Sequence, residues 1–288
     1  MENGTAGKEG YRLEMTENQA QFQADEARLK AAEVMAAGRR EIIFSDDGKT
    51  LLAYPKCLPD SVYAVPETVT KIGHDAFSCC SGLKEVILPP GLLWLEDSAF
   101  FGCTGLERIV IPDRITTIEP YTFEWCISLR DVRIPAGVKV IDSSAFRRCR
   151  SLEKLVLPEA LTRIDDRAFE HCAALTDQVF PPGVTEIGDS AFADCRSLRS
   201  VELPEGLREI AFAAFDGCSN LERALIPASV TKIGMFAFCK CRKLADIRIL
   251  NKRVRVLKDA FRSCPCEEYV RANFGIWKYV WRLFGGRF

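Results

Sequence analysis

The chain of 288 residues carries 39 lysines and arginines against 40 aspartates and glutamates, and 48% of its residues are hydrophobic. This near-neutral balance gives no electrostatic reason to expect nucleic acid or an anionic membrane as a partner. No apolar run of about 18 residues is present, so the sequence predicts no membrane-spanning helix.

Residues 1–40 are expected to form a polar segment followed by a helix. The first ten residues lack the charged start and apolar stretch of a secretion signal, which favours a cytoplasmic location. The cell surface or secretion stays open if a leader was removed. Thr16 and Gln19 fit a capping box, and residues 20–37 are rich in helix formers up to a stop at Gly38. This helix would pack on the first repeat or its hairpin, or would dock another chain.

Residues 41–66 are expected to form a capping β-hairpin. Two apolar stretches, 41–44 and 51–54, flank a turn signal at Asp46-Asp47-Gly48. A cap is needed at this end because the repeats that follow would otherwise expose their apolar columns to water.

A pattern with a period of 23 residues and no insertions occupies residues 67–264. A fixed period of roughly 20–50 residues is typical of a solenoid. Its clearest column consists of Phe77, Phe100, Phe123, Phe146, Phe169, Phe192, Phe215, Phe238 and Phe261.

Other columns keep step with the phenylalanines. In the first repeat they contain Ile72, Cys80 and Leu83, at five residues before and three and six residues after the phenylalanine. An alternating apolar pair, such as Val86 and Leu88, follows and predicts one short strand per repeat. The Ala-Phe-x-x-Cys segment has room for about one helical turn. Because a single repeat cannot offset its ordering entropy, the repeats are expected to stack and bury each column on its own kind.

The pattern Leu-x-x-Val-x-Leu-Pro-x-x-Val-x-x-Ile-x-x-x-Ala-Phe-x-x-Cys, repeated in register from about Asp47 to Cys264, resembles the BspA-like class of bacterial leucine-rich repeats. The resemblance implies a right-handed α/β-type superhelix with a parallel concave sheet, short helical turns on the convex side, and an N-terminal helix and hairpin cap. It also implies a module used for binding, often at bacterial surfaces, without catalytic residues or cofactors.

The residues between the buried strand positions are the expected partner site, because they should lie on the exposed side of the concave sheet. A contiguous apolar stripe can mark a partner site, whereas β-propensity alone would also place branched residues in strands. The row consists of Ile87, Val110, Arg133, Val156, Val179, Glu202, Leu225 and Arg248.

Two neighbouring rows of charges alternate in sign from repeat to repeat, as Lys84 and Glu107 do in one row and Glu85 and Arg108 in the other. Opposite charges on adjacent strands stabilise their pairing. We therefore expect this checkerboard to fix the register of the strands and not to attract a charged ligand.

Enzymatic chemistry is not expected. The only two histidines, His74 and His171, lie four repeats apart, and no phosphate loop or nucleophile elbow occurs.

Thirteen cysteines would suggest disulfides in a secreted chain, but nine form the inward column, where parallel Cβ vectors suit buried thiols better than disulfides. No metal is expected. Four cysteines near the C-terminal end leave zinc binding or a Cys239–Cys266 disulfide as an alternative, although column cysteines are poor zinc ligands. These are Cys239, Cys241, Cys264 and Cys266.

Residues 265–288 are rich in aromatic side chains and are expected to close the solenoid with a helix. That helix would lay Tyr269, Val270, Phe274 and Trp277 over the last phenylalanine and leucine. A membrane-surface segment or a self-association patch is the alternative.

Taken together, the sequence predicts a non-enzymatic module that presents a concave sheet to another protein, with no nucleic acid, membrane or cofactor involved. The alternative is a structural scaffold that forms homo-oligomers through its N-terminal helix or its aromatic tail.

Overall fold

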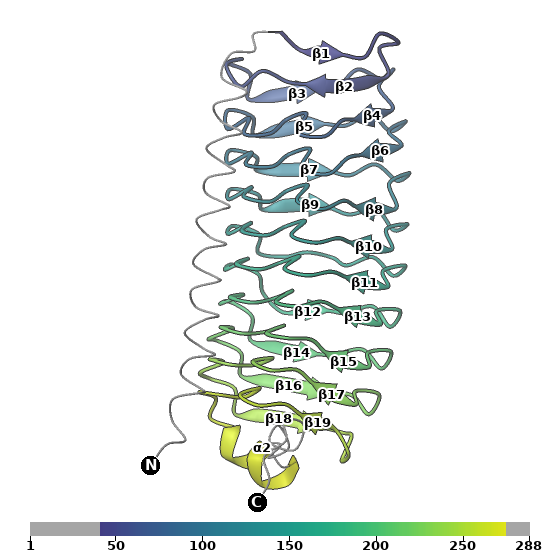
Figure 1. Cartoon of the computed structure of the whole chain (residues 1–288). Helices are drawn as coiled ribbons and strands as arrows, with labels where there is room; N and C mark the ends of the chain where they lie inside the picture. Colours follow the sequence, from purple (N-terminus) through teal and green to yellow (C-terminus); the bar gives the residue numbers. More distant parts are fainter. Residues whose placement is uncertain (1–40, 275–288) are drawn as a thin grey trace, which may run out of the picture.

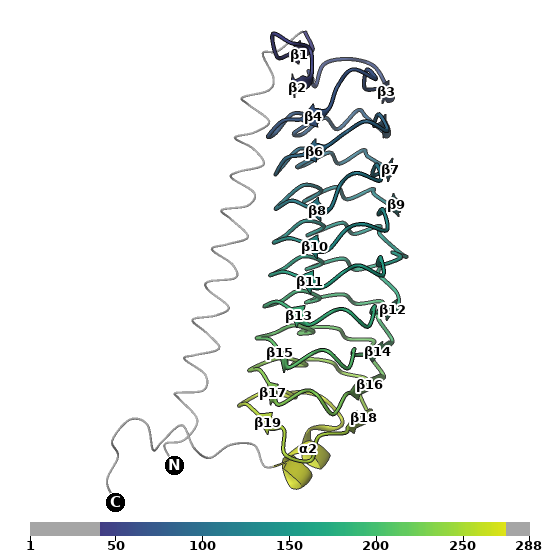
Figure 2. The same ribbon diagram turned by 90° about the vertical axis from the view of Figure 1, so that its right-hand side faces the viewer.

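The computed structural model describes residues 41–274 and is a column of stacked coils, each one 23-residue repeat long (Figure 1). Within each coil the chain passes along three sides, which we call the long-strand face, the short-strand face and the turn face. Figure 2, turned by 90°, shows the coils as successive rungs from β3 to β19. The expected repeat solenoid with parallel strands is therefore confirmed.

The long-strand face contains the strand predicted for each repeat, except in the repeat with residues 153–157, where no strand forms. It is divided into two four-stranded parallel parts, because residues 153–157 pair with neither side. Its strands are β3 (Val62–Ala64), β5 (Glu85–Ile87), β7 (Arg108–Val110), β9 (Asp131–Arg133), β12 (Gln178–Val179), β14 (Ser200–Glu202), β16 (Arg223–Ile226) and β18 (Asp246–Ile249).

The short-strand face carries a second strand per repeat, which the sequence pattern did not predict. Each strand spans only the column isoleucine and the residue before it, so no alternation is long enough to be recognised. Apart from the four-residue β2, all have two residues. They are β2 (Thr50–Ala53), β4 (Lys71–Ile72), β6 (Trp94–Leu95), β8 (Thr117–Ile118), β10 (Val140–Ile141), β11 (Arg163–Ile164), β13 (Glu186–Ile187), β15 (Glu209–Ile210), β17 (Lys232–Ile233) and β19 (Arg255–Val256).

The hairpin at the start of the described chain pairs β1 (Ile43–Phe44) antiparallel with β2. In its turn, Gly48 adopts a φ of +67°, and Asp47 accepts hydrogen bonds from the Ser45 hydroxyl and the Lys49 amide. β2 also pairs in parallel with β4 and so connects the hairpin to the short-strand face.

The turn face is built from i→i+3 turns that are interrupted by left-handed residues, so no regular helix forms where a helical turn was expected. Two residues per repeat, two before and two after each column phenylalanine, have φ between 51° and 73°. Left-handed backbone costs roughly 1–2 kcal/mol for a residue other than glycine. Hydrogen bonds between coils offset this cost, as when the Phe146 amide donates to the Ala168 oxygen at 2.8 Å.

The core is a spine of phenylalanine rings along the axis of the column. All nine column rings are 0–1% exposed. Neighbouring rings stack with centroids 4.9–5.5 Å apart and planes within 2–17° of parallel. Each coil therefore buries its phenylalanine on the next coil, as the repeat predicted.

The described chain ends in helix α2 (Glu267–Phe274) beneath the last coil (Figure 1). Val270 is fully buried and Phe274 packs partly against the core, four residues further on the same helix face. The expectation for Tyr269 was wrong, because this side chain is 51% exposed. Tyr269 directly precedes Val270, so its side chain is turned about 100° around the helix and points away from the core.

The expected helix at residues 20–37 and the end of the aromatic tail, including Trp277, lie outside the described residues. Within residues 41–274, no helix is long and apolar enough to cross a membrane.

Candidate functional site

The row of residues expected to bind a partner forms a line across the long-strand face. β5, β7 and β9 keep their register, with Val86 opposite Ile109 and Val110 opposite Arg133. β12 to β18 do the same, with Val179 opposite Glu202 and Leu225 opposite Arg248. Seven of the eight row residues thus lie in strands, while Val156 lies in the unpaired segment between β9 and β12.

Four aliphatic side chains of this row point into solvent, and the fifth, Leu225, is partly buried. Ile87 and Val110 are 51% and 55% exposed, and Val156 and Val179 are 83% and 87% exposed. Because Val156 lies within the interruption of the sheet and Val179 lies in the strand that follows it, the apolar part of the row is most accessible at its centre.

The interruption coincides with a substitution in the buried column. Gln178 occupies an inward position that is aliphatic in all of the other repeats, and it is only 6% exposed. Its Nε2 donates to the backbone oxygens of Thr176 and Asp177, while its Oε1 has no hydrogen-bond partner. A signal for this feature was present in the sequence as a break in the column of branched residues.

The charge checkerboard is formed at its N-terminal end. Lys84 Nζ lies 3.3 Å from Glu107 Oε1, and Arg108 Nε lies 3.8 Å from Glu85 Oε2. These side chains are mostly exposed, so each pair contributes at most about 1 kcal/mol. Further along the face, Asp177 instead accepts hydrogen bonds from the backbone amides of Arg199 and Ser200, both at 2.8 Å.

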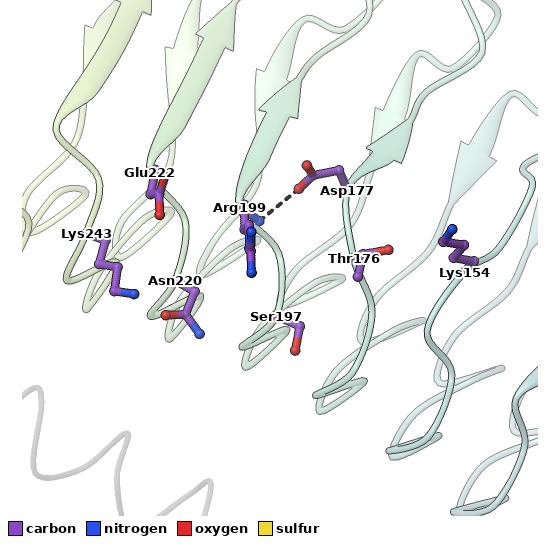
Figure 3. Close-up of a pocket in the computed structure, with 8 residues that line it drawn as sticks. All are labelled: Lys154, Thr176, Asp177, Ser197, Arg199, Asn220, Glu222 and Lys243. Carbon is purple, nitrogen blue, oxygen red and sulfur yellow. Dashed lines mark hydrogen bonds between the residues drawn. The ribbon is translucent and has the colours of Figure 1, made fainter.

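A polar groove of about 740 Å³ lies along the edge of the long-strand face where β12, β14, β16 and β18 begin (Figure 3). Figure 3 shows side chains from consecutive coils pointing into the same open space, with the hydrogen bond between Asp177 and Arg199 at its middle. Sequence reasoning did not identify this groove, because its residues come from five successive repeats and alternate in charge. It is lined by Lys154, Thr176, Asp177, Ser197, Arg199, Asn220, Glu222 and Lys243.

A buried ion cluster lies on the turn face. Arg147 bonds to Glu124 at 2.9 Å and also to Glu170, and the Arg147 and Glu124 side chains are only 5% and 1% exposed. The three residues come from successive coils at the same position of the repeat, so they join three coils through one guanidinium. Nearby, the Arg148 guanidinium lies 4.4 Å from the centre of the Trp125 ring. With each carboxylate held by an arginine, the cluster resembles a structural ion pair more than a catalytic pair.

The two histidines do not form a joint site. His74 Nδ1 lies 2.9 Å from Asp97 Oδ2. In a distant part of the column, His171 Nδ1 lies 3.4 Å from Asp194 Oδ2. Burial lowers the pKa of His171, and the carboxylates of Glu170 and Asp194 counteract this shift only in part.

The four cysteines considered for zinc are all buried at the C-terminal end of the core. The Cys241 and Cys264 thiols donate to the backbone oxygens of Phe215 and Phe238, at 3.2 and 2.8 Å. Burial raises the pKa of Cys239 and Cys241, which keeps these sulfurs protonated at neutral pH. No group of three or more potential ligands within residues 41–274 has the geometry of a metal site.

Comparison with known proteins gives a consistent result. The family model described as "BspA type Leucine rich repeat region" matches residues 53–176 and 162–274 in six copies. No curated protein matches the chain. The crystal structure of a Treponema pallidum leucine-rich repeat protein is 29% identical, with a TM-score of 0.55, over 72% of this chain and 88% of that one.

Two other solved structures are more distant. A Bacteroides ovatus leucine-rich repeat protein is 19% identical, with a TM-score of 0.49, over 83% of this chain and 90% of that one. A Faecalibacterium prausnitzii protein described as a leucine-rich cell surface protein is 21% identical, with a TM-score of 0.39, over 79% of this chain and 91% of that one.

Proposed function

This chain belongs to the BspA-type leucine-rich repeat family, and we propose that it is a non-enzymatic binding module that holds another protein against its long-strand face. Leucine-rich repeat proteins of this kind serve as interaction modules, and a solenoid offers a long, rigid surface for the purpose. The contact residues of the proposal are the eight of the exposed row, from Ile87 to Arg248.

The observation that carries the proposal is the aliphatic centre of that row. Val156 and Val179, at 83% and 87% exposed, are the most exposed large hydrophobic side chains within residues 41–274. Single exposed apolar residues are common, but these two belong to one aligned row with Ile87 and Val110. The charged members Arg133, Glu202 and Arg248 give the row a polar border, as in most protein interfaces.

The experiment compares two carboxylate substitutions on different faces of the purified chain. Val179→Glu introduces a charge into the row, and Trp94→Glu introduces one at a 57% exposed site on the short-strand face. Proteins captured from an extract of the source organism are quantified by mass spectrometry, and each captured protein is then purified for a direct affinity measurement.

The proposal expects a purified partner whose affinity falls about tenfold or more with Val179→Glu and stays within about twofold with Trp94→Glu. Equal affinity for both variants would place the interface elsewhere. Light scattering on the chain alone tests the scaffold alternative. In that alternative the purified chain forms homo-oligomers, and the captured protein is a second copy of this chain.

A further inference from the structure

The polar groove gathers three cations from alternate coils, and none of them forms an ion pair within residues 41–274. Lys84 and Arg108 near the N-terminal end have carboxylates across the strand gap. Within the described part of the chain, Lys154, Arg199 and Lys243 form no ion pair, and all three side chains are exposed. One of the two groove carboxylates, Asp177, is engaged by the backbone amides of Arg199 and Ser200. The groove therefore presents three cationic groups to solvent against one uncommitted carboxylate, that of Glu222.

The spacing of these cations follows the stacking of the coils. Lys154 lies two residues before the exposed row in its coil. Arg199 lies two coils further and three residues before the row, and Lys243 lies two coils beyond that and five residues before the row. At about 4.8 Å per strand, two repeats correspond to roughly 10 Å. The cations thus lie at intervals of about 10 Å along the axis of the column.

An α-helix matches this interval and a β-strand does not. Seven residues of a helix rise about 10.5 Å and return almost to the same face of the helix. A strand covers about 10 Å in three residues, which places successive third residues on opposite faces. A helix lying along the column would therefore bring one carboxylate per heptad to each cation.

The surroundings of the groove favour a protein ligand over an acidic polysaccharide. Lys154 and Asp177 each lie two residues before a highly exposed valine, Val156 and Val179, on the same side of the chain. An amphipathic helix can meet both the charges and the valines, as in other helix-in-groove complexes. None of the eight groove residues is aromatic, so the groove has no ring on which a sugar could stack.

We propose that this groove binds an acidic amphipathic helix of a partner protein, with carboxylates at heptad spacing on Lys154, Arg199 and Lys243 and apolar side chains on Val156 and Val179. This inference rests on the proposed function and adds the chemistry and secondary structure of the partner. The sheet interruption beside Gln178 lies where the groove meets the valines, so one end of the helix would lie against the irregular centre of the long-strand face.

The test uses the full chain and a fluorescent helical peptide of about 22 residues, with glutamates seven residues apart and leucines beside them. A second peptide has the same composition with the glutamates at irregular spacing. Arg199→Glu reverses the central cation, and Arg130→Glu makes the same change at an equivalent, exposed position three repeats away and outside the groove. Circular dichroism checks that both variants remain folded.

The proposal expects the heptad peptide to bind with an affinity that falls about tenfold in Arg199→Glu and by less than about twofold in Arg130→Glu. The irregular peptide should bind at least about fivefold more weakly, because it can satisfy only one cation at a time. Equal effects of the two variants, or equal binding of the two peptides, would overturn the proposal. So would a heparin fragment that binds more tightly than the heptad peptide, since it would assign the groove to polysaccharide.

The two proposals fail in different ways. If the heptad peptide does not bind but Val179→Glu still weakens a purified natural partner, the face binds protein and the helical specificity is wrong. If neither measurement responds, the long-strand face is not the binding surface.

Discussion

The thiol of Cys149 donates a hydrogen bond to the backbone oxygen of Phe123, with Sγ 3.1 Å from the oxygen. Phe123 belongs to the preceding coil, and its oxygen also accepts the amide of Cys126 within its own turn. The same thiol contact recurs between successive coils with distances of 2.8–3.3 Å. The cysteine column is therefore a ladder of weak donors that links each turn to the next.

Removing one of these thiol hydrogen bonds should destabilise the protein moderately. Cys149→Ala is expected to lower the free energy of unfolding by about 1–2 kcal/mol, because it removes a buried hydrogen bond and leaves a small cavity. Urea denaturation followed by circular dichroism measures this change. Cys57→Ala, at an exposed position, is the control and should stay within about 0.5 kcal/mol. A Cys149→Ala protein as stable as this control would show that the thiol has no structural role.

Phe169 supports the core from the centre of the spine, between the rings of Phe146 and Phe192. Phe169→Ala should cost about 3–5 kcal/mol, since it removes a fully buried ring with two stacked neighbours. Val110→Ala, at a 55% exposed position of the long-strand face, serves as the comparison and should have little effect. A loss below about 1 kcal/mol for Phe169→Ala would contradict the role given to the spine.

Arg147 holds two carboxylates on the turn face. Arg147→Ala is expected to cost about 3–5 kcal/mol, because it leaves Glu124 and Glu170 buried without their shared guanidinium. Arg163→Ala breaks only an exposed pair with Asp165 and should cost at most about 1 kcal/mol. Adding Glu124→Gln and Glu170→Gln to Arg147→Met should recover part of the loss. Failure of this rescue would show that the charges are not its cause.

Gln178 is a place where a substitution should stabilise the protein. Gln178→Val restores the aliphatic column and removes the Oε1 atom that has no partner, so a gain of about 1–2 kcal/mol is expected. Gln178→Ala should instead lower the free energy of unfolding, because it leaves a cavity in place of the side chain. Thermal and urea denaturation of the two variants test this difference. A loss of stability in Gln178→Val would indicate that the glutamine amide makes a necessary contact.

His171 should make stability depend on pH below neutrality. Burial lowers its pKa in the folded state below the ordinary histidine value of 6.5, against the opposing effect of Glu170 and Asp194. Between these two pKa values the unfolded chain binds more protons, so stability falls as pH is lowered from about 6.5 through the folded-state pKa. His171→Gln should reduce this fall, as measured by urea denaturation at about pH 7.5 and pH 5.5. An identical pH dependence in the variant would rule out His171 as its source.

The solenoid, the phenylalanine spine and the alignment of the exposed row could all be predicted from the 23-residue period. A strict period fixes which residues stack, because every coil has the same length and Phe77 therefore lies against Phe100 of the next coil. The burial of Val270 was also foreseeable, since an apolar residue follows the last repeat where an open end must be covered.

The short-strand face, the left-handed turns and the groove could not be predicted from the sequence, because each depends on contacts between coils. Two-residue strands such as Lys71–Ile72 have no periodicity of their own and exist because neighbouring coils supply their hydrogen-bond partners. Arg148 and His171 adopt left-handed backbone, a conformation their residue types disfavour, because hydrogen bonds between coils offset the cost. Lys154, Arg199 and Lys243 line one groove because stacking at a fixed rise places residues two coils apart at about 10 Å from each other along the column axis.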